Sequence, residues 1–111
     1  MSKPLISRAV KAGNLIFLSG MTGEGDDTET QIRSIFEKVR ETLEEAGSSM
    51  GNVVAATVYL TDLDDRPKYL NPIWREMFPD NPPTRTTVQA GLSPPMTVEI
   101  TVTALMPEER L

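Results

Sequence analysis

The sequence contains neither cysteine nor histidine. The first absence excludes disulfides and thiolate nucleophiles, and the second excludes the usual zinc sites and every catalytic pair with an imidazole base. Chemistry must therefore rest on arginine, lysine, carboxylates, hydroxyls, backbone groups or bound water, and we expect no metal and no cofactor. Asp62, Asp64 and Asp65 lack the glycine and distal glutamate of a calcium loop, which favours a helix-capping role for them.

Positively charged residues are fewer than negatively charged ones. The 11 lysines and arginines are outnumbered by 16 aspartates and glutamates, which gives a net charge of −5. This balance opposes a phosphate backbone, so we expect no nucleic-acid partner. Long apolar runs are missing as well, since the run at 15–18 is too short for a signal peptide or a membrane span. The resulting expectation is a cytoplasmic protein without a membrane partner.

What is present suits one folded domain over residues 1–111. The hydrophobic share of 39% and the charged share of 24% are ordinary for a globular protein. A chain of 111 residues is long enough to bury one core, and no internal repeat is visible. We therefore expect order nearly throughout.

Hydrophobic spacing predicts the first half of the fold. A short strand at 15–18 follows a turn and pairs with residues 6–10 as a hairpin. A helix over about 29–46 comes next, because its apolar residues recur at helical spacing. The pair Thr28 and Gln31 has the pattern of a capping box at the start of this helix.

The second half begins with the almost unbroken apolar run 53–60, typical of a strand in the middle of a sheet or buried on both faces. A second amphipathic helix ends near Phe78. Pro72 leaves two alternatives for its start. The helix begins near Pro67 and kinks at Pro72, or Asn71 is the N-cap and Pro72 the first helical residue.

Two further strands are predicted at 84–89 and 97–104. The last one alternates cleanly, with aliphatic residues on one face and threonines plus Glu99 on the other. The order ββαβαββ provides two helices to cover one face of a sheet of four or five strands. The face that carries Glu99 either meets water or contacts another subunit.

Four positions are candidates for chemistry. The planar fork of Arg85, at the start of a predicted strand, suits a carboxylate, although position alone favours an ordinary surface ion pair. Glu99 is either a proton acceptor for an attacking water or a solvent-facing strand residue. Ser19 and Gly20 end the first apolar strand, where a ligand can approach the backbone or the chain simply turns.

Several blocks of the sequence, together with their spacing, resemble the Rid/YjgF family over nearly the whole chain. They read AVKAGNLIFLSG, VVAATVYLTDLDD, NPIWREMFPDNPPTRTTVQ and MTVEITVTA. The resemblance implies an α+β, Bacillus chorismate mutase-like fold, a mixed sheet with two helices on one face. It also implies a homotrimer whose pockets lie in the clefts between subunits.

The resemblance further implies an activity. Deaminating members of that family hydrolyse 2-aminoacrylate and related imines, released by pyridoxal-phosphate-dependent dehydratases, to 2-keto acids and ammonia. By this resemblance Arg85 binds the substrate carboxylate and Glu99 positions the water molecule. Ser19 and Gly20 provide backbone or hydroxyl contacts, and Asn71 lies near the pocket. An imine carbon is already electrophilic, so such chemistry needs positioning but neither histidine nor metal.

The chain departs from the family pattern at its N-terminal end. The family's Gly-Pro-Tyr-Ser-Gln-Ala-Val corresponds to residues 4–10, and Ile6 replaces a pocket tyrosine. The loop after Gly20 is abbreviated, and the segment before Glu99 is shorter by about one residue than in the family pattern. Loss of the tyrosine hydroxyl and ring puts 2-aminoacrylate in question as the substrate and points to a different imine.

Two functions therefore stand side by side: hydrolysis of small 2-imino acids, and non-catalytic or regulatory binding of a small carboxylate in the same pocket. The second keeps Arg85 and makes Glu99 dispensable. Chorismate mutase chemistry shares the fold but requires further cations around a dianionic substrate, and the sequence offers no convincing second arginine. Ribonuclease activity, associated with some relatives, is the weakest option for an acidic chain without histidine.

Overall fold

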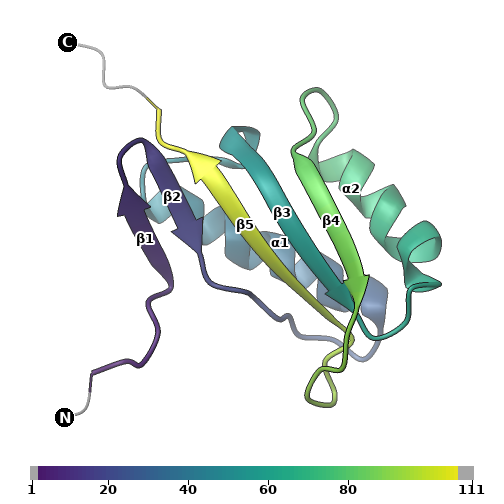
Figure 1. Cartoon of the computed structure of the whole chain (residues 1–111). Coiled ribbons are helices and arrows are strands. Elements are labelled where there is room, and N and C mark those ends of the chain that lie inside the picture. The colour runs from purple at the N-terminus through teal and green to yellow at the C-terminus, as the bar shows by residue number, and fades with distance from the viewer. Residues whose placement is uncertain (1–2, 108–111) are drawn as a thin grey trace.

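Five strands form one mixed sheet in the computed structural model, which describes residues 3–107 (Figure 1). The strands are β1 (Ala9–Ala12), β2 (Leu15–Leu18), β3 (Val53–Leu60), β4 (Thr84–Gln89) and β5 (Val98–Leu105). Their order across the sheet is β1-β2-β5-β3-β4, with β3 and β4 parallel and all other neighbours antiparallel. Four strand predictions hold closely, whereas β1 begins at Ala9 and not at the predicted Ile6.

Two helical segments cover one face of this sheet (Figure 1). Helix α1 spans Thr28–Glu45, a short 3-10 turn η1 spans Met50–Asn52, and the second helix consists of η2 (Arg66–Leu70) followed by α2 (Asn71–Met77). The prediction of an α+β fold with a mixed sheet and two helices on one face is thus confirmed. None of the helices within residues 3–107 is long and apolar enough to cross a membrane. The cytoplasmic location stays a prediction.

The start of α1 differs from the predicted capping box, which is wrong. The N-cap is Asp27, whose Oδ1 accepts a 2.8 Å hydrogen bond from the backbone N–H of Thr30. Thr28 already lies inside the helix. An aspartate one position earlier supplies the same acceptor that the predicted threonine would supply, so it takes the capping position.

Gln31 lies inside the molecule, where its side chain amide joins three segments. Its Nε2 donates to the carbonyls of Gly25 and Pro95, both at 3.1 Å, and its Oε1 accepts from the N–H of Thr97 at 2.9 Å. These bonds satisfy the polar atoms of a side chain that is 1% exposed. Gln31 therefore fixes the chain just before β5.

The second helix begins at Arg66, so the alternative in which Asn71 is the N-cap is wrong. Asn71 has helical backbone angles (φ −62, ψ −44), and its N–H donates to the carbonyl of Arg66, five residues back. This wider turn directly precedes Pro72, which has no N–H to donate to an ordinary helical ladder. Asn71 consequently lies within a continuous helical segment.

The core lies between the helices and the sheet. Its aromatic part joins the two helices, because the Phe36 ring of α1 lies 5.8 Å, edge to face, from the rings of both Trp74 and Phe78. Alternate residues of β5 complete the core from the sheet, as the sequence pattern predicts: Val98, Ile100, Val102 and Ala104 are all buried.

The opposite face of the sheet is open in the single chain. Glu99, Thr101 and Thr103 of β5 are half-buried there. Large apolar side chains are exposed on the same face, by register and alternation: Val10, Phe17, Val88 and Leu105. This face therefore combines the predicted threonines and glutamate with apolar area that the single chain does not cover.

Candidate functional site

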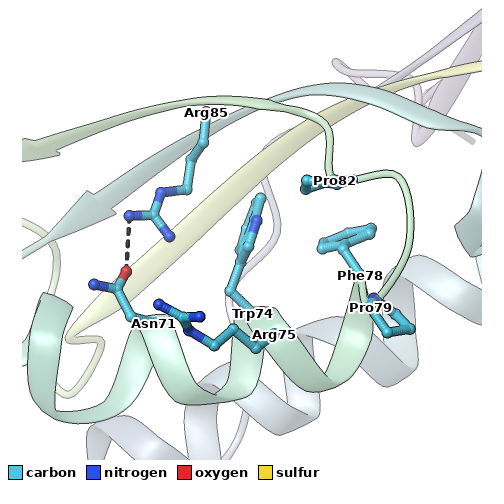
Figure 2. Close-up of a pocket in the computed structure, with 7 residues that line it drawn as sticks. All are labelled: Asn71, Trp74, Arg75, Phe78, Pro79, Pro82 and Arg85. Atoms are coloured by element: carbon cyan, nitrogen blue, oxygen red, sulfur yellow. Dashed lines mark hydrogen bonds between the residues drawn. The ribbon is translucent and has the colours of Figure 1, made fainter.

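Arg85, the second residue of β4, extends toward α2 on the helix-covered side of the sheet (Figure 2). Its Nη2 donates a 2.9 Å hydrogen bond to Oδ1 of Asn71. The central carbon of its guanidinium lies 5.0 Å from the centre of the Trp74 ring, within cation–π range. Asn71 and Trp74 thus hold the guanidinium from two sides and leave most of its five N–H donors available.

The space in front of Arg85 is an open cleft of ≈ 580 Å³. We call it the Arg85 cleft, and its lining residues are Asn71, Trp74, Arg75, Phe78, Pro79, Pro82 and Arg85 (Figure 2). A cavity of this size falls in the range of small-molecule sites, roughly 300–1,000 Å³. The aromatic and proline side chains form apolar walls, and the two arginines provide positive charge.

Arg85 has no carboxylate within 4.0 Å among residues 3–107, where the ion pairs involve Arg8, Arg33 and Arg40. The surface ion pair considered for it is therefore not seen in this part of the chain. Partial burial lowers the pKa of the Arg85 guanidinium from its usual value, and the positive charge of Arg66 lowers it further. Arginine still stays protonated at neutral pH, so the cleft presents a partly desolvated cation that an anion would stabilise.

A second polar group lies on the open face of the sheet. Glu99 of β5 is paired in register with Tyr59 of β3. A β-carbon built on Gly20 would lie 2.6 Å from Oε2 of Glu99 and 3.1 Å from Oγ1 of Thr101. Glycine leaves room for the carboxylate in this position, whereas a larger residue would require the end of the Glu99 side chain to move. We call Gly20, Tyr59, Glu99 and Thr101 the Glu99 corner.

Ser19 ties the N-terminal segment to the end of β2 beside this corner. Its hydroxyl donates a 2.7 Å hydrogen bond to the carbonyl of Ser7, and its N–H donates a 3.0 Å bond to the carbonyl of Arg8. Ser19 and Gly20 line a hollow of ≈ 330 Å³ with Arg8, Met21, Thr22 and Lys38. Ile6, which the resemblance aligns with a tyrosine, is 68% exposed and lies in the preceding segment.

The predicted site residues therefore form two groups within one chain. Register pairs Arg85 with Ala56 and Glu99 with Tyr59. Ala56 and Tyr59 are three positions apart on β3, so their side chains project from opposite faces of the sheet. Ala56 is buried beneath the helices. Arg85 and Asn71 thus lie on the helix side, whereas Glu99 lies on the open side.

Two residues of these groups were missed from the sequence. Arg75 lies one helical turn after Asn71, a spacing that places both on one helix face. Tyr59 lies opposite Glu99, which becomes visible only when the strand register is known. Across residues 3–107, no group of three or more His, Cys, Asp or Glu side chains is placed to hold a metal ion.

Comparisons with known proteins cover almost the whole chain. Residues 3–106 match the family model described as Endoribonuclease L-PSP. Protein mmf2, mitochondrial, of Schizosaccharomyces pombe is 40% identical over 94 residues, which are 79% of this chain and 74% of that protein. A crystal structure of a YjgF-family protein from Neisseria meningitidis superposes with a TM-score of 0.91 at 33% identity, covering 97% of this chain and 92% of that one.

Two similar proteins carry names that state an activity. Reactive Intermediate Deaminase A, chloroplastic, of Arabidopsis thaliana is 34% identical over 96 residues, 79% of this chain and 51% of that protein. The 3-aminoacrylate deaminase RutC of Acinetobacter baylyi is 32% identical over 95 residues, 78% of this chain and 75% of that protein. Deaminases are therefore among the proteins that share this sequence pattern.

Proposed function

The chain belongs to the endoribonuclease L-PSP family, which includes YjgF proteins, and from that membership we propose that it deaminates 2-imino acids by hydrolysis. The Arg85 cleft carries the proposal, because it offers a carboxylate-sized ligand a partly buried cation beside an amide and an aromatic wall. The names of two relatives support deamination as the reaction type. The proposed products are a 2-keto acid and ammonia.

In the proposed reaction, Arg85 forms a bidentate ion pair with the substrate carboxylate, and Asn71 keeps the guanidinium in place. Glu99 accepts a proton from a water molecule as the water oxygen bonds to C2 of the imine. That proton passes to the nitrogen, which gives a carbinolamine with a hydroxyl and an NH2 group on C2. Glu99 then transfers the hydroxyl proton to the nitrogen, the C2–N bond breaks, and ammonia leaves as the C2 carbonyl forms. Enamines such as 2-aminoacrylate enter after tautomerisation to the imine. Each step requires placement of groups rather than a strong acid or base.

The proposed site needs a second copy of the chain. Arg85 and Glu99 project from opposite faces of one sheet, so a small substrate in the Arg85 cleft meets the Glu99 corner of a neighbouring chain. We propose the homotrimer that the family resemblance implies. Exposed Val10, Phe17 and Leu105 on the open face support an assembly that covers this face.

A binding protein without turnover is the second candidate. The observation that favours it is that Arg85, Asn71 and Trp74 lie together at one cleft of a single chain, whereas Glu99 is not part of that cleft. Trp74 is the sole tryptophan and lies under Arg85, so its fluorescence reports ligand binding directly. Saturable quenching by 2-keto acids without any imine hydrolysis would favour this candidate.

The decisive measurement is imine hydrolysis. An amino-acid oxidase generates imines from a panel of amino acids, and semicarbazide competes with the protein for the free imine. We expect the wild type to reduce semicarbazone formation, and Arg85→Ala to lose about 10- to 100-fold in kcat/KM, the value of a charge-assisted pair. Arg85→Lys should recover little, because lysine lacks the planar fork.

Lys68→Gln is the matched control, since it removes one exposed positive charge from the same helical segment outside the cleft lining. Circular dichroism and gel filtration verify that each variant keeps its fold and assembly. Equal acceleration by the wild type and Arg85→Ala would refute the proposal.

A further inference from the structure

The Arg85 cleft contains a second arginine that the proposed reaction does not use. Arg75 follows Asn71 by one turn of α2, and its side chain lines the cleft together with Asn71 and Arg85 (Figure 2). Helical side chains lean toward the N-terminus of their helix, which accounts for this placement. Two guanidinium groups therefore border the same space.

Three of the other arginines within residues 3–107, namely Arg8, Arg33 and Arg40, lie within 4.0 Å of a carboxylate, whereas Arg66 does not. Arg33 contacts Glu76 at 2.9 Å, and Arg40 contacts Glu37 at 2.8 Å. By contrast, neither Arg75 nor Arg85 has a carboxylate within 4.0 Å among residues 3–107. Glu76, the direct sequence neighbour of Arg75, is turned toward α1 by its bond with Arg33. The cleft thus keeps its positive charge in a protein with a net charge of −5.

The positive charge is larger than one carboxylate requires. Arg66 adds a further cation close enough to disfavour the charged form of Arg85. Arg66 lies outside the cleft lining, so the two cations that border the cleft are Arg75 and Arg85, and a ligand with two negative groups can pair with both. In the single chain, before a neighbouring chain meets it, the cleft of ≈ 580 Å³ exceeds what a three-carbon acid fills.

We propose, on the basis of the function proposed above, that Arg75 binds a second acidic group and that the protein prefers 2-imino acids with a side-chain carboxylate. In this arrangement Arg85 holds the carboxylate next to the imine carbon and Arg75 holds the distal one. The methylene groups between them lie along Trp74. Imines of the glutamate type are then better substrates than imines with apolar side chains.

Ligand binding tests the preference without turnover. The probes are 2-oxoglutarate and 5-methyl-2-oxohexanoate, in which an isopropyl group replaces the distal carboxylate, and Trp74 fluorescence is the readout. We expect 2-oxoglutarate to bind about fivefold more tightly, the value of an exposed ion pair, and its advantage to shrink at high salt. Arg75→Gln should abolish the difference, whereas the Lys68→Gln control should keep it.

Hydrolysis of glutamate-derived and leucine-derived imines then separates the two proposals. A higher kcat/KM for the glutamate imine in the wild type, lost in Arg75→Gln, supports the preference for a second carboxylate. Hydrolysis of both imines with no preference, or an equal loss for both in Arg75→Gln, overturns the role of Arg75 and leaves the deaminase proposal standing. Selective binding of 2-oxoglutarate without hydrolysis of either imine supports the role of Arg75 and overturns the deaminase proposal.

Discussion

The Arg85 cleft and the Glu99 corner are built in different ways. In the cleft, helix packing brings the Trp74 ring and the Asn71 amide against a guanidinium from an edge strand. In the corner, strand pairing and the missing side chain of Gly20 define where the carboxylate of Glu99 lies. One region is fixed by side-chain packing and the other by backbone shape. In the proposed reaction, binding and proton transfer are therefore separable, and each can be disturbed alone.

The largest expected effect comes from mixing two inactive variants. Arg85→Ala and Glu99→Gln, unfolded and refolded together in equal amounts, should regain about a quarter of wild-type hydrolysis, although each alone is nearly inactive. The reason is that about three quarters of randomly mixed trimers contain both chains, and each of these has one intact interface out of three. No recovery, with mixed trimers verified by mass spectrometry, would show that the two regions do not act across chains.

Gly20→Ala tests the corner alone. Its β-carbon would collide with Oε2 of Glu99, so the carboxylate must move away from its place. We expect kcat to fall about tenfold or more while ligand quenching of Trp74 in the cleft stays unchanged. Gly91→Ala is the control, since a β-carbon there meets nothing within 4 Å. Weaker ligand binding in Gly20→Ala would contradict the separation of the two regions.

Asn71→Ala tests the cleft alone. It removes the 2.9 Å bond that orients the guanidinium, and bonds to charged groups contribute about 1.5–3 kcal/mol. We expect about a tenfold weaker Kd for 2-keto acids with kcat changed less. Asn81→Ala, in the exposed loop before β4, should leave the Kd unchanged. An unchanged Kd in Asn71→Ala would mean that Arg85 does not depend on this contact.

The smallest effect is expected far from both regions, at the N-cap of α1. The hydrogen bond from the Thr30 backbone lowers the pKa of Asp27 in the folded protein. Because the pKa of Asp27 is lower in the folded protein than in the unfolded chain, its carboxylate stabilises the fold above the unfolded pKa. This stabilisation is lost as the pH falls through the folded pKa. Asp27→Ala should therefore lower the midpoint of urea unfolding slightly at neutral pH, and the difference should vanish in acid. Hydrolysis at neutral pH should not change.

Much of the fold follows from local patterns in the sequence. Helical spacing identifies α1, and the apolar run at 53–60 and the alternation in β5 identify two central strands. Such periodicities depend only on residues close together in the chain, so they are visible without a structure. The start of α1 shows the limit of such local patterns. Thr28 and Gln31 have capping-box spacing, but Asp27 caps the helix and the Gln31 side chain bonds to other segments.

The two faces of the site show the same limit more clearly. The side of Glu99 was evident from the sequence, since its neighbours Val98 and Ile100 belong to the core. The side of Arg85 was not, because the only aliphatic residue of β4, Val88, is on the open face and suggests the wrong orientation. Its true side depends on pairing with Ala56 of β3, a contact between distant segments.

The sequence by itself thus determined the family, the order of elements and the identity of Arg85 and Glu99 as candidates. The tertiary structure alone decided that Arg75 shares the cleft with Arg85 and that Glu99 lies on the other face. The physical reason is that periodicity is a local property, whereas register and the convergence of side chains arise from packing between segments far apart in the chain.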